Sequence, residues 1–483
     1  MRLKTLVLAI AAGCCSLAVV ASAGASSAPV VSSPMDVTNS FYAGNEESLG
    51  MSTDGTLLAG AWNDWHYNDG CGFSYSADGG DSWAPETFVP GLTEFTNDPS
   101  IPGIGPFPIA GDPAVSYNPK SGLFDVVCQA FGGRGNSIEL LSTTFDPSLA
   151  NPSLDVNDSY GHAAWRLPAT PVATGSAPGT QKGSNGHFPD HETIAVDTNP
   201  SSPHYGRLYV GWAEFNGSGR SPIEVAYSDD NGAHWTGPIR VSDSGHQFDQ
   251  DARPAVAPDG TVYMTWINGP NETSLKNNVA MIDVSHNGGA TWGRDHVVAS
   301  IIDPVPGQLP NSKYRVFSDV WSTVDQATGT VVVTFNDERS GASNVYATHD
   351  LGGDLGSWSP AVAVKPAAQE EFFPWLSSAP DGRVDLVYYD RSCDPFDTLN
   401  CVTLSSTYDG GATWSSVSLL SQGFDGDKFQ ACLAFVQPPD CGVYFLGDYI
   451  AVASIDSKAQ VLWTGNGPHA QDVFSARATF AGG

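Results

Sequence analysis

The chain has 483 residues and a formal net charge of −31 at pH 7, so it repels nucleic acid phosphates and anionic membrane surfaces. We therefore expect no nucleic-acid partner. With 41% hydrophobic and 11% aromatic residues, the composition also excludes a disordered acidic chain and indicates a folded protein with a large core.

Residues 1–23 have the pattern of a secretory signal peptide, with Arg2 and Lys4 ahead of an apolar run and Ala21-Ser22-Ala23 at the cleavage site. A lipoprotein anchor at Cys14 is the alternative. Residues 24–35 are expected to form a flexible N-terminal segment. No later apolar run is long enough to predict a membrane span. We expect a secreted, extracellular protein.

The cysteines beyond the signal peptide are even in number, which in an exported chain predicts disulfides. The simplest pairing joins the near neighbours Cys393–Cys401 and Cys432–Cys441 and leaves Cys71–Cys128, although other pairings remain open. The chain has no Cys-x-x-Cys pair, so a zinc site is not expected.

A Gly-rich turn ending in Trp recurs along the chain. It reads SADGGDSW at 76–83, SDDNGAHW at 228–235, SHNGGATW at 285–292 and TYDGGATW at 407–414, with a stretched copy at 348–358. Each copy follows a run in which apolar and polar residues alternate. Strand, Gly-rich turn and strand together predict a β-hairpin, in which the Asp or Asn side chain bonds turn amides and the Trp is buried.

A second repeat consists of β-branched, largely apolar runs that end near an aromatic residue, the pattern of strands buried inside a sheet. These runs lie at 56–62, 123–131, 207–213, 261–267, 330–336, 383–389 and 460–464. A shorter strand precedes most of them. Each unit then reads as inner strand, apolar strand, third strand, turn and Trp strand, and no helical periodicity competes with it.

Four antiparallel strands recurring at this spacing predict an all-β fold, a β-propeller. We favour seven four-stranded blades, with six as the alternative. The last unit, 447–480, shows only three strands, and residues 35–43 are expected to supply the fourth and close the ring. The propeller would form a single domain over residues 36–480.

The S-x-D-x-G-x-x-W pattern is the Asp-box, and on this pattern the chain resembles the sialidase (neuraminidase) superfamily, whose Asp-box repeats are also called BNR repeats. The resemblance implies a propeller whose Asp-box turns lie on the outside, remote from the active site. The residues to which it assigns this structural role are Asp78, Trp83, Asp230, Trp235, Asn287, Trp292, Asp409 and Trp414.

The loops at the other end of the blades carry acids, arginines and aromatic residues, which predicts a sugar site at the propeller mouth. Glycoside hydrolysis usually requires two acidic groups, one protonated and one charged. Sialidases instead use an Asp acid/base, a Tyr nucleophile activated by a Glu, and three arginines that grip the substrate carboxylate. The candidate catalytic residues are Glu214, Asp251, Glu371, Tyr314 and Tyr389, and the candidate substrate-binding arginines are Arg134, Arg220, Arg253, Arg315, Arg339 and Arg391.

The sequence thus favours an exported, sialidase-like glycoside hydrolase that acts on extracellular glycans as a monomer. It lacks the early Phe/Tyr-Arg-Ile-Pro stretch of sialidases, and YRVF at 314–317 is the nearest match. The alternatives are a polysaccharide lyase, with His66, His191 or Tyr67 as its base, and a non-catalytic glycan- or protein-binding propeller. No cofactor is required, although the acids at 190–192 and 249–251 make calcium a candidate ligand.

The polar mouth residues also have a structural interpretation. Asp337 with Arg339, and Asp390 with Arg391, recur at equivalent points of two blades, which is typical of ion pairs or turn caps. On the same interpretation, Asp112, Asp190, Asp251 and Asp448 would hold neighbouring loops together.

Overall fold

The computed structural model describes residues 28–65, 70–93, 107–132, 137–154, 158–176, 186–217, 219–245, 248–269, 278–304, 309–431 and 444–481. The signal-peptide expectation, Arg134, the His66 and Tyr67 candidates, and Cys432 and Cys441 lie outside these residues. Within the described part the chain is all β, with one short 3-10 helix, η2 (His162–Ala164). No helix in this part is long and apolar enough to cross a membrane.

Four sheets contain four antiparallel strands each, in chain order. They consist of β3 (Gly44–Met51), β4 (Leu58–Asp64), β5 (Gly70–Ser76) and β6 (Thr87–Phe88); β15 (Asp249–Val256), β16 (Val262–Asn268), β17 (Asn278–Ser285) and β18 (His296–Ile301); β19 (Val320–Val324), β20 (Val331–Asp337), β21 (Asn344–His349) and β22 (Val362–Ala363); and β23 (Glu371–Ser378), β24 (Val384–Asp390), β25 (Leu399–Thr407) and β26 (Ser415–Asp425).

A fifth sheet has eight strands, and it is built from two four-stranded units that are joined through the single pair Ser176 and His187. Its strands are β7 (Ile109–Asn118), β8 (Leu123–Phe131), β9 (Ser137–Phe145), β10 (Thr170–Ser176), β11 (His187–Val196), β12 (Leu208–Asn216), β13 (Ile223–Ser228) and β14 (Thr236–Arg240).

The last sheet combines both ends of the described chain. It consists of β27 (Ala451–Ile455), β28 (Lys458–Asn466) and β29 (Gln471–Thr479), with β1 (Val30–Val31) and β2 (Met35–Asp36) paired to the outer edge of β29. Met35 lies opposite Ser475, so the N-terminal segment does supply an outer strand here, though a shorter one than the expected 35–43.

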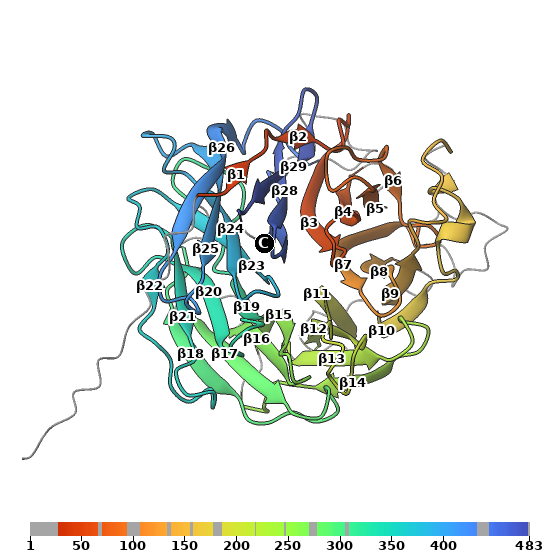
Figure 1. The fold of residues 1–483 in the computed structure, drawn as a ribbon, viewed down its shortest axis with the longest axis horizontal. Helices are drawn as coiled ribbons and strands as arrows, with labels where there is room; N and C mark the ends of the chain where they lie inside the picture. The colour runs from red at the N-terminus through yellow and green to blue at the C-terminus, as the bar shows by residue number, and fades with distance from the viewer. Residues whose placement is uncertain are drawn as a thin grey trace, which may run out of the picture.

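The first strands of successive units contact one another in the order β3, β7, β11, β15, β19, β23 and β27, and β27 contacts β3 again. Figure 1 shows the sheets spread around this inner circle of strands. The predicted apolar runs coincide with β4, β8, β12, β16, β20, β24 and β28. In β4, β20 and β24 every residue is buried, because the sheets on both sides cover these strands.

The four regular Asp-box turns share one hydrogen-bond pattern. In the first, the Asp78 carboxylate accepts hydrogen bonds from the Ser82 amide (2.9 Å) and the Ser76 hydroxyl (2.8 Å), and Ser76 Oγ accepts the Gly80 amide. The turns at Asp230, Asn287 and Asp409 repeat these contacts. Their tryptophans, Trp83, Trp235, Trp292 and Trp414, each pack against a core cluster.

Strand register places these turns at one end of each sheet. Met51 at the end of β3 pairs with Leu58, and Leu58 pairs with Ser76, where the turn begins. Gly44 at the start of β3 instead pairs with Asp64. The starts of the inner strands and the loops that follow the apolar strands therefore lie at the opposite end, which we call the mouth.

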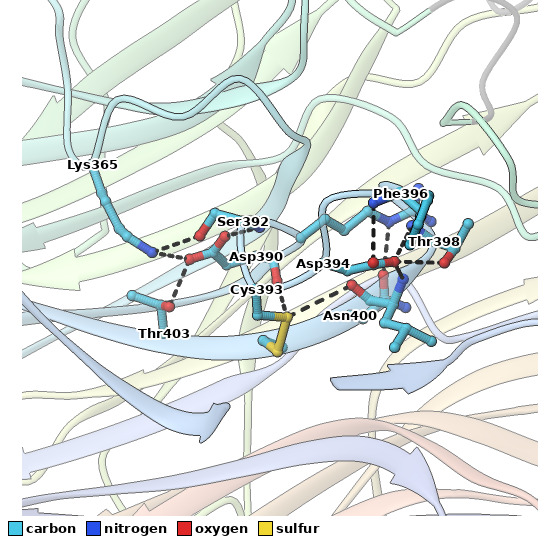
Figure 2. Close-up of a disulfide and its surroundings, with 12 residues drawn as sticks. Lys365, Asp390, Ser392, Cys393, Asp394, Phe396, Thr398, Asn400 and Thr403 are labelled. Atoms are coloured by element: carbon cyan, nitrogen blue, oxygen red, sulfur yellow. Dashed lines mark hydrogen bonds and ion pairs between the residues drawn. A yellow bond between two sulfur atoms is a disulfide. The ribbon is translucent and has the colours of Figure 1, made fainter. Parts of the chain in front are cut away.

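Two of the expected disulfides, Cys71–Cys128 and Cys393–Cys401, are present. The first joins β5 to β8 across two neighbouring sheets, and the second closes the loop between β24 and β25. Figure 2 shows this loop with the ion pair between Lys365 and Asp390 on one side. On the other side the Asp394 carboxylate accepts the amides of Phe396, Thr398 and Leu399 at 2.9–3.0 Å.

Candidate active site

Five inner strands carry the same irregularity at the mouth. The register shifts across residues 45–48 (NEES), 111–114 (GDPA), 190–193 (DHET), 250–253 (QDAR) and 372–375 (FFPW). In each stretch the second residue has a positive φ, between 48° and 64°. These residues are Glu46, Asp112, His191, Asp251 and Phe373. Positive φ is unfavourable for side chains other than glycine, and such bulges occur next to functional sites.

The bulges and the segments leading into β19 and β27 gather titratable side chains that we call the central cluster. Its members are Glu46, Asp112, Asp190, His191, Glu192, Asp251, Arg253, Arg315, Asp319, Asp448 and Tyr449. They come from six of the seven inner strands or from the residues just before them.

Glu46 and Asp112 form a carboxyl pair on the neighbouring strands β3 and β7. Asn63 donates a side-chain hydrogen bond to Glu46 and accepts the Asp112 amide at 2.7 Å, so it orients both residues. The Asp448 amide donates to the other Glu46 oxygen at 3.0 Å. Burial, together with the carboxylates of Asp112 and Asp448, raises the pKa of Glu46 well above its usual value. Burial and the neighbouring carboxylates therefore favour the protonated form of Glu46.

Asp190 lies on the next inner strand, β11, and is only partly buried. Gln129 donates to its carboxylate at 3.1 Å. Burial and the nearby Asp112 carboxylate raise the pKa of Asp190 to about 6, against the opposing effect of His191. At neutral pH Asp190 is therefore mainly ionised, whereas burial and the neighbouring acids favour the protonated form of Glu46.

His191 and Asp251 form an ion pair between β11 and β15, with Nδ1 2.5 Å from the carboxylate. Burial by itself would lower the pKa of His191, but the Asp251 carboxylate outweighs burial and raises that pKa to about 9. The imidazole is therefore a cation at neutral pH.

Arg253 and Asp319 form a second buried ion pair, at 3.1 Å. The Arg253 guanidinium also lies 4.4 Å from the centre of the Trp321 ring, and Trp321 stacks on Trp375 at 3.6 Å. Burial raises the pKa of Asp319 to about 7 although Arg253 opposes this. These contacts fix Arg253 firmly within the cluster.

Tyr449 lies beside His191, with 5.5 Å between the ring centres. Among the described residues, no group hydrogen-bonds to the buried Tyr449 hydroxyl or to His191 Nε2. Burial first, and then the nearby acids, raise the pKa of Tyr449 and that of Glu192 well above their usual values. Buried polar groups rarely lack partners, so these atoms indicate a place where a polar ligand can bind.

Arg315 lies at the rim of the cluster, with 61% of its side chain exposed. Its guanidinium forms a two-point ion pair with Asp448, which raises the pKa of Arg315 further although burial opposes this. Acidic members outnumber the basic members His191, Arg253 and Arg315, so the cluster as a whole is a region of negative potential.

Among the candidates from the sequence, the cluster brings together Asp251, Arg253 and Arg315, and the other candidate acids and tyrosines lie elsewhere. Glu214 on β12 contacts His187 (3.1 Å) and Trp212 (3.0 Å). Glu371 accepts the Val345 amide at 3.0 Å. Tyr314 bonds Asn400 and Arg391, and Tyr389 bonds Thr464.

The other candidate arginines that the structure describes also lie outside the central cluster. Arg220 is exposed on the loop after β12. Arg339 pairs with Asp337 at 2.8 Å, and Arg391 is buried between Asn400, Tyr314 and two backbone carbonyls. Arg339 and Asp337 thus form the local ion pair expected on the structural interpretation, whereas Asp390 pairs with Lys365 and not with Arg391.

Glu46, Asp319, Trp321 and Trp375 were not among the residues predicted from the sequence, and Glu192 was considered only as part of the calcium candidate at 190–192. The sequence feature that could have identified these residues is the short polar stretch at the start of each inner strand. This stretch was expected to precede the strand, but it lies inside the strand as a bulge. The described residues contain no group of three or more His, Cys, Asp or Glu side chains arranged to hold a metal ion.

No protein-family model matches the chain, and no curated protein matches it. Solved structures that resemble it include the Hadza microbial sialidase Hz136, with 18% identity, a TM-score of 0.44, and coverage of 90% of this chain and 65% of that one. This chain therefore spans less than two thirds of that sialidase chain. The GH93 α-L-arabinofuranosidase of Fusarium graminearum has 14% identity, a TM-score of 0.38, and coverage of 60% and 93%.

A PL25 ulvan lyase structure overlaps more completely, with a TM-score of 0.51, 11% identity, and coverage of 93% of both chains. Such low identity supports a shared fold and no more. The described sheets are arranged around an inner circle of strands, with β27 in contact with β3, so the all-β fold is of the propeller type, and the ulvan lyase has a similar fold.

Proposed function

We propose that this protein is a glycoside hydrolase that acts at the central cluster on a neutral glycan. The observation that carries the proposal is the contrast between Glu46, whose protonated form is favoured by burial and by the nearby Asp112 and Asp448 carboxylates, and Asp190 on the inner strand β11, whose pKa of about 6 leaves it mainly charged. One protonated and one charged carboxyl group is the requirement for this reaction.

In this mechanism the Glu46–Asp112 pair donates its proton to the glycosidic oxygen through the partly exposed Asp112. Asp190 acts from the other side, either as the base that activates water or as the nucleophile. Asn63 positions the acid pair. The reaction needs no cofactor, and calcium binding stays a separate proposal.

Two features favour a neutral substrate over sialic acid: the negative potential of the central cluster, and the ion pairs and hydrogen bonds that the arginines already make. Arg253 and Arg315 are each already paired with a carboxylate, and Arg339 and Arg391 are engaged outside the cluster. A substrate carboxylate would therefore share Arg253 with Asp319 or Arg315 with Asp448, inside a negative region.

The test is to incubate the mature protein with neutral polysaccharides and aryl glycosides and to measure new reducing ends. Glu46→Gln and Asp190→Asn should each lower kcat by about 10²–10⁴-fold, the usual contribution of acid–base catalysis. Asp125→Asn is the matched control, because Asp125 is a buried acid of raised pKa outside the cluster. Activity that survives both cluster substitutions contradicts the assignment.

A polysaccharide lyase is the second candidate, favoured by the neighbouring His191 and Tyr449, whose unpartnered polar atoms suit proton transfer. The ulvan lyase resemblance adds fold-level support only. In β-elimination a base removes the proton next to the uronate carboxylate, and an acid protonates the leaving oxygen. A uronic-acid polymer that yields products with new ultraviolet absorbance would favour this candidate, and reducing ends without that absorbance would favour hydrolysis.

We further propose a single seven-bladed propeller, with the eight-stranded sheet counted as two blades; the expected range 36–480 then extends back to Val30, because β1 and β2 pair with β29 and close the ring. The disulfides are consistent with export, with residues 1–23 removed. Size-exclusion chromatography with light scattering tests the proposed monomer, and mass spectrometry of the exported protein tests the cleavage.

A further inference from the structure

Aromatic rings lie next to the central cluster at the mouth, and they include an exposed stacked pair. Phe41, just before β3, is 72% exposed and stacks on His469 with ring centres 4.1 Å apart and an angle of 15° between the rings. His469 is also exposed and lies in the turn between β28 and β29. No described side chain covers this pair as a core would.

Trp65 and Phe445 form a second, edge-to-face pair at 5.9 Å. Hydrogen bonds hold these two rings in place. Trp65 Nε1 donates to Asn45 at 3.2 Å, Asn45 donates to Gln471 at 3.4 Å, and Gln471 donates to the Phe445 carbonyl at 2.9 Å. Gln471 is two residues beyond His469, so the same short segment supports both pairs. We call Phe41, Trp65, Phe445 and His469 the aromatic ledge.

The aromatic ledge adjoins the central cluster at two points. Asn45 directly precedes Glu46 in β3. The Arg315 guanidinium lies 5.0 Å from the centre of the Phe445 ring while it pairs with Asp448. A chain that crosses from the cluster onto the ledge would therefore pass Arg315, whose N–H groups are placed to donate to hydroxyl oxygens.

We propose that the aromatic ledge binds the sugar units of a neutral polysaccharide next to the bond that the cluster cleaves. This inference rests on the proposed function. Pyranose and furanose rings present C–H faces that pack on aromatic rings, while their hydroxyl groups bond to polar neighbours such as Arg315. Fixed rings lose little entropy on binding, so an ordered ledge suits an extended chain better than a single sugar.

Affinity electrophoresis in gels containing arabinan, galactan, xylan or β-glucan tests this binding directly, without requiring catalysis. Wild-type protein should be retarded by at least one of these polymers. The double variant Phe41→Ala/His469→Ala should bind that polymer at least about 10-fold more weakly, a loss of about 1.4 kcal/mol. Tyr408→Ala is the matched control, since Tyr408 is 53% exposed beside the Asp409 turn at the far end.

Failure of this inference and failure of the proposed function have different signatures. If the double variant loses binding but wild type yields no reducing ends, the ledge is supported and the hydrolase is not. If wild type cleaves and the double variant keeps its KM for the polymer, the ledge is overturned and the hydrolase stands. Retardation only by an anionic polymer such as polygalacturonate, or by no polymer, also overturns the ledge.

Discussion

The positive φ of Glu46, Asp112, His191 and Asp251 is the residue-scale feature on which the candidate site depends. Such a conformation costs on the order of 1–3 kcal/mol for a residue other than glycine. Its recurrence at the second position of each bulge means that the fold maintains it against this cost. Asp112 in its bulge lies close enough to the acids of both neighbouring strands to raise the pKa of Glu46 and that of Asp190.

The charge of His191 should depend on Asp251. In wild type we expect the imidazole to titrate at about 9, because the carboxylate outweighs burial. In Asp251→Asn the carboxylate is gone, and burial together with nearby Arg253 should bring the pKa below the usual value of about 6.5. NMR titration of the His191 ring, assigned with a His191→Gln variant, measures this. An unchanged pKa in Asp251→Asn would show that the ion pair does not control it.

At the scale of elements, the Asp-box turn is stabilised by its own side chains. Burial by itself would raise the pKa of Asp78, but Asp78 accepts three hydrogen bonds from Ser76 and Ser82, and together such bonds outweigh burial and lower the pKa to about 2. Asp78→Ala should lower the free energy of unfolding by about 1 kcal/mol. Asp78→Asn should cost less, because Asn287 forms the equivalent turn. Urea denaturation measures both, and glycan cleavage should be unaffected because the turn lies far from the mouth.

The two disulfides should differ in their effect on stability, because they close loops of different length. Their cysteines are separated by 57 and 8 residues. The loop-entropy relation gives about 4 kcal/mol for Cys71–Cys128 and about 2.5 kcal/mol for Cys393–Cys401. We expect Cys71→Ser/Cys128→Ser to lower the unfolding free energy more than Cys393→Ser/Cys401→Ser in denaturant titrations. The reverse order would mean that strain or residual structure in the unfolded chain dominates.

Across the whole molecule, many carboxyl groups are buried without a full set of partners. Burial is the main cause that raises the pKa of Glu47, Asp125 and Glu371 to about 8. The folded state therefore binds more protons than the unfolded state from about pH 4 upward. Their contribution to stability is complete below the unfolded pKa and is lost as pH rises through about 8.

We therefore expect Tm to fall by roughly 5 °C or more between about pH 6 and pH 9, where these groups must ionise. The His191–Asp251 pair should add to the decline near pH 9. Scanning calorimetry at several pH values measures the slope, and Asp125→Asn should reduce it because the amide has no charge to bury. A Tm that rises over this range contradicts the expected linkage.

Much of the architecture could be predicted from the sequence, because the relevant signals are local. Alternating and continuous apolar runs gave the strands, for example 330–336 against the observed Val331–Asp337. The Asp-box pattern located the turns at Asp78, Asp230, Asn287 and Asp409, since each turn is stabilised within eight residues of itself. Cysteine spacing predicted the Cys393–Cys401 disulfide because this pair too is close in sequence.

Only the tertiary structure decided which polar residues share the centre. Asp251, Arg253 and Arg315 were chosen together with Glu214, Tyr389 and Arg391, and nothing in their local sequence separates the two groups. Asp251 and Arg253 lie at the bulge of the inner strand β15 and pair with His191 and Asp319 of the neighbouring units, whereas Glu214 on the second strand β12 contacts His187 and Trp212 of its own sheet. The partners of Glu46, among them Asp112 and Asp448, are brought together only when the ring of sheets is complete.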